Sequence, residues 1–322
     1  MDPEQFFTAS RVIIVAGKGG VGKTAVTAAL AVAASRVGLR TLVVEVEGKA
    51  GLAAMFGADV LSFDESTLVE PGDGRGGVFA RTVTPDEALL EYLRSNGLQR
   101  ISNRLVSSGA LELISTAVPG IRDILVLGGV KALERSGEFD LVLLDAPAAG
   151  HAITFLRSAA GLADAVKVGP INTQAEEVLG LLGDPERCRV VLVTVPEETP
   201  VNELIQTAYS LEDEVGVALG PVVVNGVVTD LAGLDADPDE AALTAGVSLL
   251  DGEADLLAAA SQFRRARMDL QRTQLDRMAA ELPLPQIQLP YVVTSQLDRD
   301  HLDLLAQRLL DHLADAPTGG PA

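Results

Sequence analysis

The chain of 322 residues is long enough for one large α/β domain with a sizeable core. Apolar residues make up 48% and charged residues 22%, a balance that excludes a disordered or fibrous protein. The 25 basic and 45 acidic residues give a net charge of -20, which disfavours nucleic acid and anionic membrane surfaces as partners. A single cysteine, Cys188, excludes an internal disulfide framework and a zinc or iron–sulfur site built from paired thiolates of one chain.

The longest nearly unbroken apolar run, residues 25–34, is about half of what a bilayer-spanning helix needs. The acidic start of the chain lacks the basic-then-apolar order of a secretion signal. We therefore expect a cytoplasmic protein with no direct membrane insertion.

Apolar runs of strand length alternate with helix-like segments along the chain. A strand at 11–16 is followed by a helix from Lys23 that Gly38 closes, and a second strand follows at 41–47. Thr84 and Glu87 form a capping box that starts a further helix, with Pro85 at its first turn. The remaining expected strands lie at 78–83, 139–147, 189–195, 221–228 and 285–290. This alternation predicts a single-domain α/β fold with a doubly wound, mostly parallel sheet flanked by helices.

No repeat and no Pro/Ser/Gly linker divides the chain. We expect an N-terminal extension at 1–10, one large domain at 11–316 with a helical insertion at about 86–135, and a flexible tail at 317–322. The acidic segment 229–240 is expected to be an exposed loop.

A phosphate-binding loop follows the first strand. The segment GKGGVGKT, residues 17–24, satisfies G-x-x-x-x-G-K-[ST] between a strand and a helix, the context that this motif requires. Glycines let successive amides point inward, and the helix start adds partial positive charge, so the loop suits a polyphosphate. We expect the Lys23 ammonium to reach the β- and γ-phosphates of ATP and the Thr24 hydroxyl to bind Mg²⁺. The predicted nucleotide-binding residues of the loop are Gly17, Gly19, Gly20, Val21, Gly22, Lys23 and Thr24.

The second lysine of the loop, Lys18, makes GKGGVGKT resemble the deviant Walker A sequence of the MinD/ParA, nitrogenase-iron-protein and arsenite-pump ATPases. The resemblance implies a sandwich dimer in which Lys18 crosses to the nucleotide of the partner subunit. A cation supplied in trans stabilises charge that develops on the transferred phosphoryl group. The alternative is a solvated loop lysine.

The run FDLVLLDAP at 139–147 has the pattern of a Walker B strand, and its Asp145 is expected to hold Mg²⁺ through water. The following residues, DAPAAGHAITFLR, resemble the switch II stretch of the arsenite-pump and tail-anchored-protein-targeting ATPases. That likeness assigns Gly150 to a backbone hinge and His151 to a relay of the nucleotide state. A strand-end cap for Asp145 and a statically packed His151 are the alternatives.

The stretch EGKAGLAAMF, residues 47–56, aligns with switch I of the same family. Glu47 falls where that family has the aspartate that orients the attacking water, so its extra methylene is a departure that predicts slow or differently gated turnover. The alternative is a solvated charge at a strand end.

Three later residues resemble the family's adenine site. Asn225 ends a strand, and its amide can pair with a donor and an acceptor of adenine, while Pro290 and Tyr291 offer a flat apolar cover. A turn-forming Asn and a core Tyr are the alternatives.

The chain is thus similar to the arsenite-pump (ArsA) and tail-anchored-protein-targeting family, in its bacterial anion-transporting-ATPase branch. The resemblance implies Mg²⁺-dependent ATP hydrolysis coupled to open and closed forms of a homodimer, or of a heterodimer with a paralogue, that acts on an unidentified client protein. The apolar helical stretch at 105–130 stands at the family's client-binding location and is either a groove or core. The alternative functions are a nucleotide-binding regulatory scaffold with little hydrolysis and a MinD/ParA-type positioning ATPase.

Overall fold

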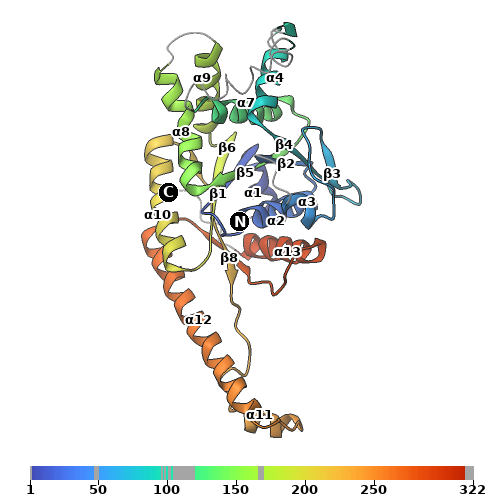
Figure 1. Ribbon diagram of the computed structural model, residues 1–322, viewed down its shortest axis with the longest axis vertical. Coiled ribbons are helices and arrows are strands. Elements are labelled where there is room, and N and C mark those ends of the chain that lie inside the picture. Colours follow the sequence, from blue (N-terminus) through green and yellow to red (C-terminus); the bar gives the residue numbers. More distant parts are fainter. Residues whose placement is uncertain are drawn as a thin grey trace.

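A computed structural model describes residues 2–46, 51–95, 97, 99–100, 103, 120–165 and 170–315. One sheet of nine strands runs through it in the order β3-β4-β2-β5-β1-β6-β8-β9, with the short β7 paired to β6 (Figure 1). Every pairing is parallel except that of β3 with β4. The sheet confirms the predicted doubly wound, mostly parallel α/β class. The strands are β1 Val12–Gly17, β2 Thr41–Val46, β3 Ser66–Val69, β4 Val78–Val83, β5 Leu141–Ala148, β6 Cys188–Thr194, β7 Ala218–Leu219, β8 Val222–Val227 and β9 Gln286–Pro290.

Two layers of helices cover the two faces of the sheet, because the central strands are apolar on both sides. Helices α1, α2, α3 and α13 pack on one face, and α4, α7, α8, α9 and α10 pack on the other. Their bounds are α1 Pro3–Thr8, α2 Lys23–Arg36, α3 Gly51–Met55, α4 Pro85–Ser95, α7 Ile121–Ser136, α8 Ala149–Ala165, α9 Pro170–Leu182, α10 Glu198–Val215 and α13 Arg299–Asp315.

The N-terminal extension is anchored by apolar burial. Asp2 caps α1, and Phe6 and Phe7 are fully buried in the layer that contains α2 and α13. Thr84 caps the start of α4 as predicted: the amide of Glu87 donates to Thr84 Oγ1, and the Thr84 hydroxyl donates to the Glu87 carboxylate.

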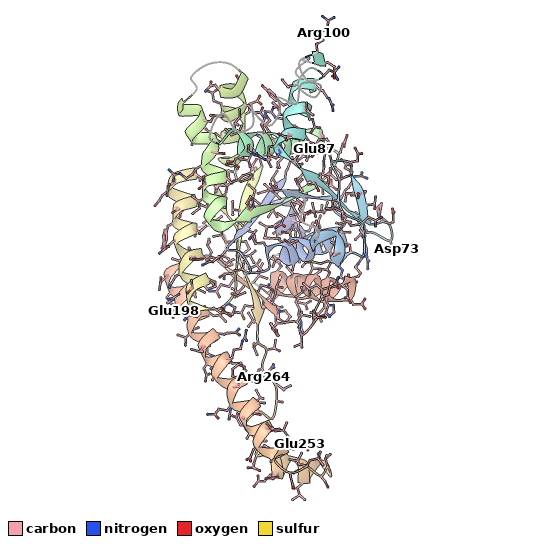
Figure 2. All side chains as sticks on the ribbon, viewed as in Figure 1. Asp73, Glu87, Arg100, Glu198, Glu253 and Arg264 are labelled. Carbon is pink, nitrogen blue, oxygen red and sulfur yellow. The ribbon has the colours of Figure 1, made fainter. Side chains whose placement is uncertain are left out.

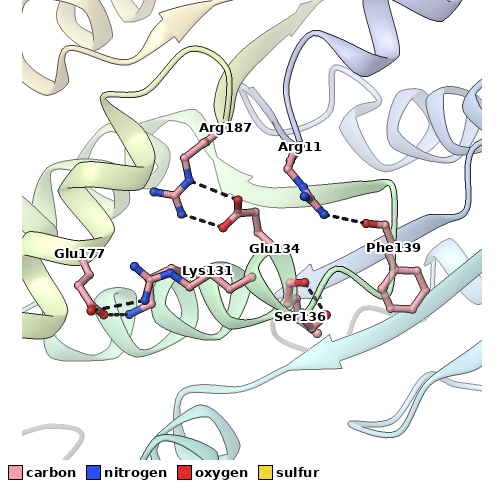
Figure 3. Close-up of polar contacts among 9 residues, drawn as sticks. Arg11, Lys131, Glu134, Ser136, Phe139, Glu177 and Arg187 are labelled. Atoms are coloured by element: carbon pink, nitrogen blue, oxygen red, sulfur yellow. Dashed lines mark hydrogen bonds and ion pairs between the residues drawn. The ribbon is translucent and has the colours of Figure 1, made fainter.

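Partly buried ion pairs hold α7 against its neighbours (Figure 3). The Lys131 ammonium donates to Gln174 Oε1 over 2.9 Å and pairs with Glu177, both on α9. The hydrogen bond from Lys131 lowers the pKa of the Glu177 carboxyl. Glu134 accepts two hydrogen bonds from Arg187, which stands just before β6. Helix α7 is therefore tied to α9 and to the segment before β6 by charge as well as by apolar contact. Residues 104–119, which make up most of the apolar stretch 105–130, lie outside the described residues.

The acidic segment after β8 is an exposed loop as far as Asp237, as expected, and a helix begins in its last three residues. Asp237 accepts hydrogen bonds from the amides of Asp239 and Glu240 and so starts a short helix, α11 Pro238–Ala245. The 29-residue helix α12 Glu253–Glu281 then runs back to the body, and the two helices project from it as an arm (Figure 1). Within the described residues, none of the helices combines the length and the apolar character that a membrane crossing requires. The predicted tail at 317–322 lies outside the described residues.

Candidate nucleotide site

The phosphate loop joins β1 to α2 at the carboxyl edge of the sheet. Gly20 and Gly22 have φ values of 85° and 89°, in the left-handed region that favours glycine. A Cβ on Gly22 would lie 2.2 Å from Asn225 Nδ2, and one on Gly17 would lie 2.3 Å from the Val193 carbonyl oxygen. Glycine is therefore required both for the turn and for its close approach to β6 and β8.

The two lysines of the loop have different partners. Lys23 is 9% exposed, and its ammonium donates to the Lys18 carbonyl over 3.0 Å, so it folds across its own loop. The Lys18 side chain is 43% exposed and pairs with Glu203 of α10. One ammonium thus contacts the loop that carries it, and the other contacts a helix outside the loop.

A hydroxyl and a carboxylate meet at the start of α2. The Thr24 hydroxyl donates to Asp145 Oδ2 over 2.7 Å, and Asp145 is 4% exposed near the end of β5. The Thr27 hydroxyl lies 3.5 Å from the other carboxylate oxygen of Asp145. Glu45 of β2, 1% exposed, stands directly across from Asp145 in the parallel register. Two buried carboxylates beside a threonine hydroxyl form a concentrated set of hard oxygen donors.

This donor set fits Mg²⁺. Magnesium is usually held by one or two carboxylates together with water and substrate phosphates, not by a cage of protein ligands. The described part of the chain holds no group of three or more His, Cys, Asp or Glu side chains that could hold a metal ion.

A cavity of about 260 Å³ lies beside the loop and contains the predicted adenine residues. Asn225, Pro290 and Tyr291 line it together with Ala25 of α2 and Leu305 of α13. Asn225 Nδ2 donates to the Val21 carbonyl over 3.0 Å, which links this cavity directly to the phosphate loop.

Helix α12 also reaches the cavity. Gln271, 4% exposed, accepts a hydrogen bond from the Val228 amide over 2.8 Å and donates to the Gly226 carbonyl over 3.3 Å. The Arg267 guanidinium lies 5.6 Å from the centre of the Tyr291 ring. The root of the arm is therefore bonded to the residues that flank Asn225.

Other predicted residues stand apart from this cluster or cannot be placed in it. Glu47 lies outside the described residues, and Gly150 and His151 are described as backbone only, at the start of α8. Gly19 lies in the exposed turn of the loop.

Sequence reasoning missed Glu45, Thr27, Glu203, Arg267 and Gln271. Glu45 carried a usable signal, because a carboxylate inside the apolar strand 41–46 is unusual unless it has a partner or a function. The others are set by contacts between distant parts of the chain.

Comparison with known proteins agrees with this geometry. Residues 10–178, which include the phosphate loop and Asp145, match the family model described as anion-transporting ATPase. The chain belongs to the anion-transporting ATPase family. It is an ATPase.

The chain is 33% identical over 302 residues to ATPase BagA of Mycobacterium tuberculosis, covering 88% of this chain and 87% of that protein. It is 27% identical over 234 residues to a putative arsenical pump-driving ATPase of Halobacterium salinarum, covering 67% of this chain and 35% of that protein. It is 29% identical over 181 residues to ATPase get3 of Schizosaccharomyces japonicus, covering 54% of each chain. The chain is thus similar both to a putative arsenical pump-driving ATPase and to a get3 ATPase.

Proposed function

We propose that this ATPase hydrolyses Mg²⁺-bound ATP as a dimer, which ATP binding closes and hydrolysis opens, and that the cycle acts on a client protein. The observation that carries the dimer proposal is a difference between the two loop lysines: Lys23 is buried and bonds to its own loop, whereas Lys18 is partly exposed and pairs with α10. The resemblance to tail-anchored-protein-targeting ATPases supports a protein client. The second subunit is either an identical copy or a paralogue.

In this proposal the loop amides and Lys23 hold the phosphates, and Asn225, Pro290 and Tyr291 hold the adenine base in the adjoining cavity. Thr24 and Asp145 would hold the metal ion, which supplies positive charge to the β- and γ-phosphate oxygens when it is bound. Glu47 is the proposed acceptor that orients the attacking water, and Gly150 and His151 are the proposed switch residues.

Lys18 has to leave Glu203 before it can reach a nucleotide in the other subunit. Both side chains of that pair are more than one third exposed, 43% for Lys18 and 37% for Glu203. An exposed pair contributes about 0.2–1 kcal/mol, so breaking it is a small cost beside the charge that the ammonium would neutralise. The pair supports a resting state from which Lys18 is released on closure.

Arsenite is disfavoured as the cargo. Soft thiolates are the ligands suited to such a metalloid, but Cys188 is fully buried and burial raises the pKa of its thiol to about 12.

The test of trans catalysis is Lys18→Ala. We expect the variant to bind ATP with nearly unchanged affinity but to lose about a hundredfold or more in turnover, the lower range for removing one preorganised charge donor. Glu203→Gln is the companion variant, because it frees Lys18 without removing the ammonium and should keep turnover. Unchanged hydrolysis by Lys18→Ala would reject the trans role of this lysine.

A further inference from the structure

The arm leaves the molecule from the edge of the sheet that carries the nucleotide site. Strand β8 is parallel to β6, and β6 is parallel to β1, so the carboxyl end of β8 lies at the same edge as the phosphate loop. The arm, residues 229–270, begins just beyond that end, and Gln271 ties the returning helix α12 to the same edge. The 18 residues of α12 between Glu253 and Gln271 extend about 27 Å past it at 1.5 Å per residue.

One side of α12 carries an apolar stripe that is exposed along its whole length. Leu256, Phe263 and Leu270 recur every seven residues and are 72%, 70% and 67% exposed. Small residues, also exposed, occupy the intervening positions of the stripe: Ala259, Ala266 and Thr273. Figure 2 shows this part of the arm, with Glu253 and Arg264 labelled, standing clear of the body. A seven-residue repeat of this kind is the seam of a left-handed pair of helices, so the partner that fits the stripe is another helix.

The stripe is complementary to itself when two copies run antiparallel. One antiparallel alignment sets a large side chain of one copy against a small side chain of the other in every layer. The facing pairs are Leu256 with Thr273, Phe263 with Ala266 and Leu270 with Ala259. Such alternation fills the space between two helices. A parallel pair would set Phe263 on Phe263 and Ala266 on Ala266, which alternates crowding with voids.

Charge also favours the antiparallel pair. Residues 237–255, towards the tip, carry six carboxylates and no basic residue, whereas Asp235 lies at the root and pairs with Arg265 of its own chain. Residues 264–277 carry five arginines and two aspartates, a net charge of 5 − 2 = +3. Antiparallel pairing sets the acidic tip of one copy beside the arginine-rich part of the other, whereas parallel pairing would bring the two acidic tips together.

We infer that the arms of two copies of this chain pair antiparallel along this stripe. The inference rests on the dimer of the proposed function. The pairing centres between Arg264 and Arg265, six to seven residues from Gln271, so the two nucleotide-bearing edges face each other about 20 Å apart along the helix axis. The arms would then keep the two sites opposed throughout the cycle, and Gln271 and Arg267 would join each arm to its own base cavity.

Disulfide trapping tests the register. In the double variant Ala259→Cys, Leu270→Cys, the two cysteines of one chain lie 11 residues apart on a helix, about 16 Å, too far to bridge. Antiparallel pairing brings each of them beside the other in the second copy, so mild oxidation should give mainly disulfide-linked dimer. Each single variant should stay at the level of the wild-type chain, whose Cys188 is buried. The matched control is the double variant Ala258→Cys, Leu270→Cys. Ala258 is exposed, as Ala259 is, but it does not lie on the stripe.

Sedimentation measures the oligomeric state and so distinguishes a failure of this inference from a failure of the proposed dimer. We expect Phe263→Glu to weaken self-association, and Val60→Glu, at an equal exposure of 70%, to leave it unchanged. Efficient cross-linking of the single variants would show parallel pairing and overturn the inference. A dimer that forms with Mg²⁺ and ATP but does not cross-link through the double variant would overturn arm pairing while leaving the proposed dimer intact. A chain that is monomeric under every condition would overturn both.

Discussion

Individual side chains divide the work of the phosphate loop. Lys23 bonds to its own loop and Lys18 pairs with Glu203 of α10, although the two lysines lie only five residues apart in one loop. The Thr24 hydroxyl donates to Asp145 Oδ2 over 2.7 Å, so these two oxygen atoms lie next to each other. The sequence motif predicts which residue types are present, and the local contacts decide the direction of each.

Cys188 gives a prediction at this scale. Complete burial raises the pKa of its thiol from an ordinary 9.0 to about 12. At pH 8 the thiol should therefore resist alkylation in the native protein and should be fully alkylated once the protein is unfolded. Because the folded pKa is the higher one, stability from this group is fully present below about pH 9 and declines as the pH rises towards 12. Iodoacetamide labelling followed by mass measurement checks the first point. Rapid labelling of folded protein at pH 8 would show that β6 opens at this residue.

At the scale of elements, Gln271 of α12 links the arm to the strand β8 that carries Asn225 of the predicted adenine cavity. Gln271→Ala removes a hydrogen bond to the Val228 amide and one to the Gly226 carbonyl, next to Asn225. Loss of about 1 kcal/mol of support at this point should weaken ATP binding roughly fivefold while changing the maximal rate less. Titration with a fluorescent ATP analogue measures this. The control is Gln262→Ala, an exposed change on the same helix. Equal ATP affinities for the two variants would show that Gln271 does not support the nucleotide site.

Most elements could be predicted from local pattern, and the arm could not. Strand 78–83 was predicted with its observed bounds, and the other six predicted strands lie within two residues of the observed ones, because buried parallel strands are continuous apolar runs. The arm is different, because α12 buries only Gln271 and Met278. Most of this helix does not pack on the rest of its own chain, so no pattern of buried residues marks its place in the fold. The Lys18–Glu203 pair joins residues 185 apart, and only the fold brings them together.

At the scale of the whole molecule, a net charge of -20 surrounds one phosphate-binding loop that carries two lysines. The sheet brings Glu45 and Asp145 to the same edge as that loop, so anionic ligands and cations are drawn to one place on an otherwise acidic surface. The candidate site was predictable where it follows a motif, at residues 17–24 and Asp145. It was not predictable where it depends on strand order, as at Glu45, or on a distant helix, as at Gln271.

The central claim is that this loop, with Lys23 above it and Thr24 and Asp145 beneath, is where the ATPase holds Mg²⁺-bound ATP. Calorimetric titration of ATP into the full chain, with Mg²⁺ and then with a chelator, tests this most directly when wild type and Lys23→Ala are compared. We predict one site per chain that needs Mg²⁺ for full affinity and that Lys23→Ala weakens at least about tenfold, the loss of one charge-assisted contact to phosphate. Undiminished ATP binding by a folded Lys23→Ala variant, or binding indifferent to Mg²⁺, would contradict the account.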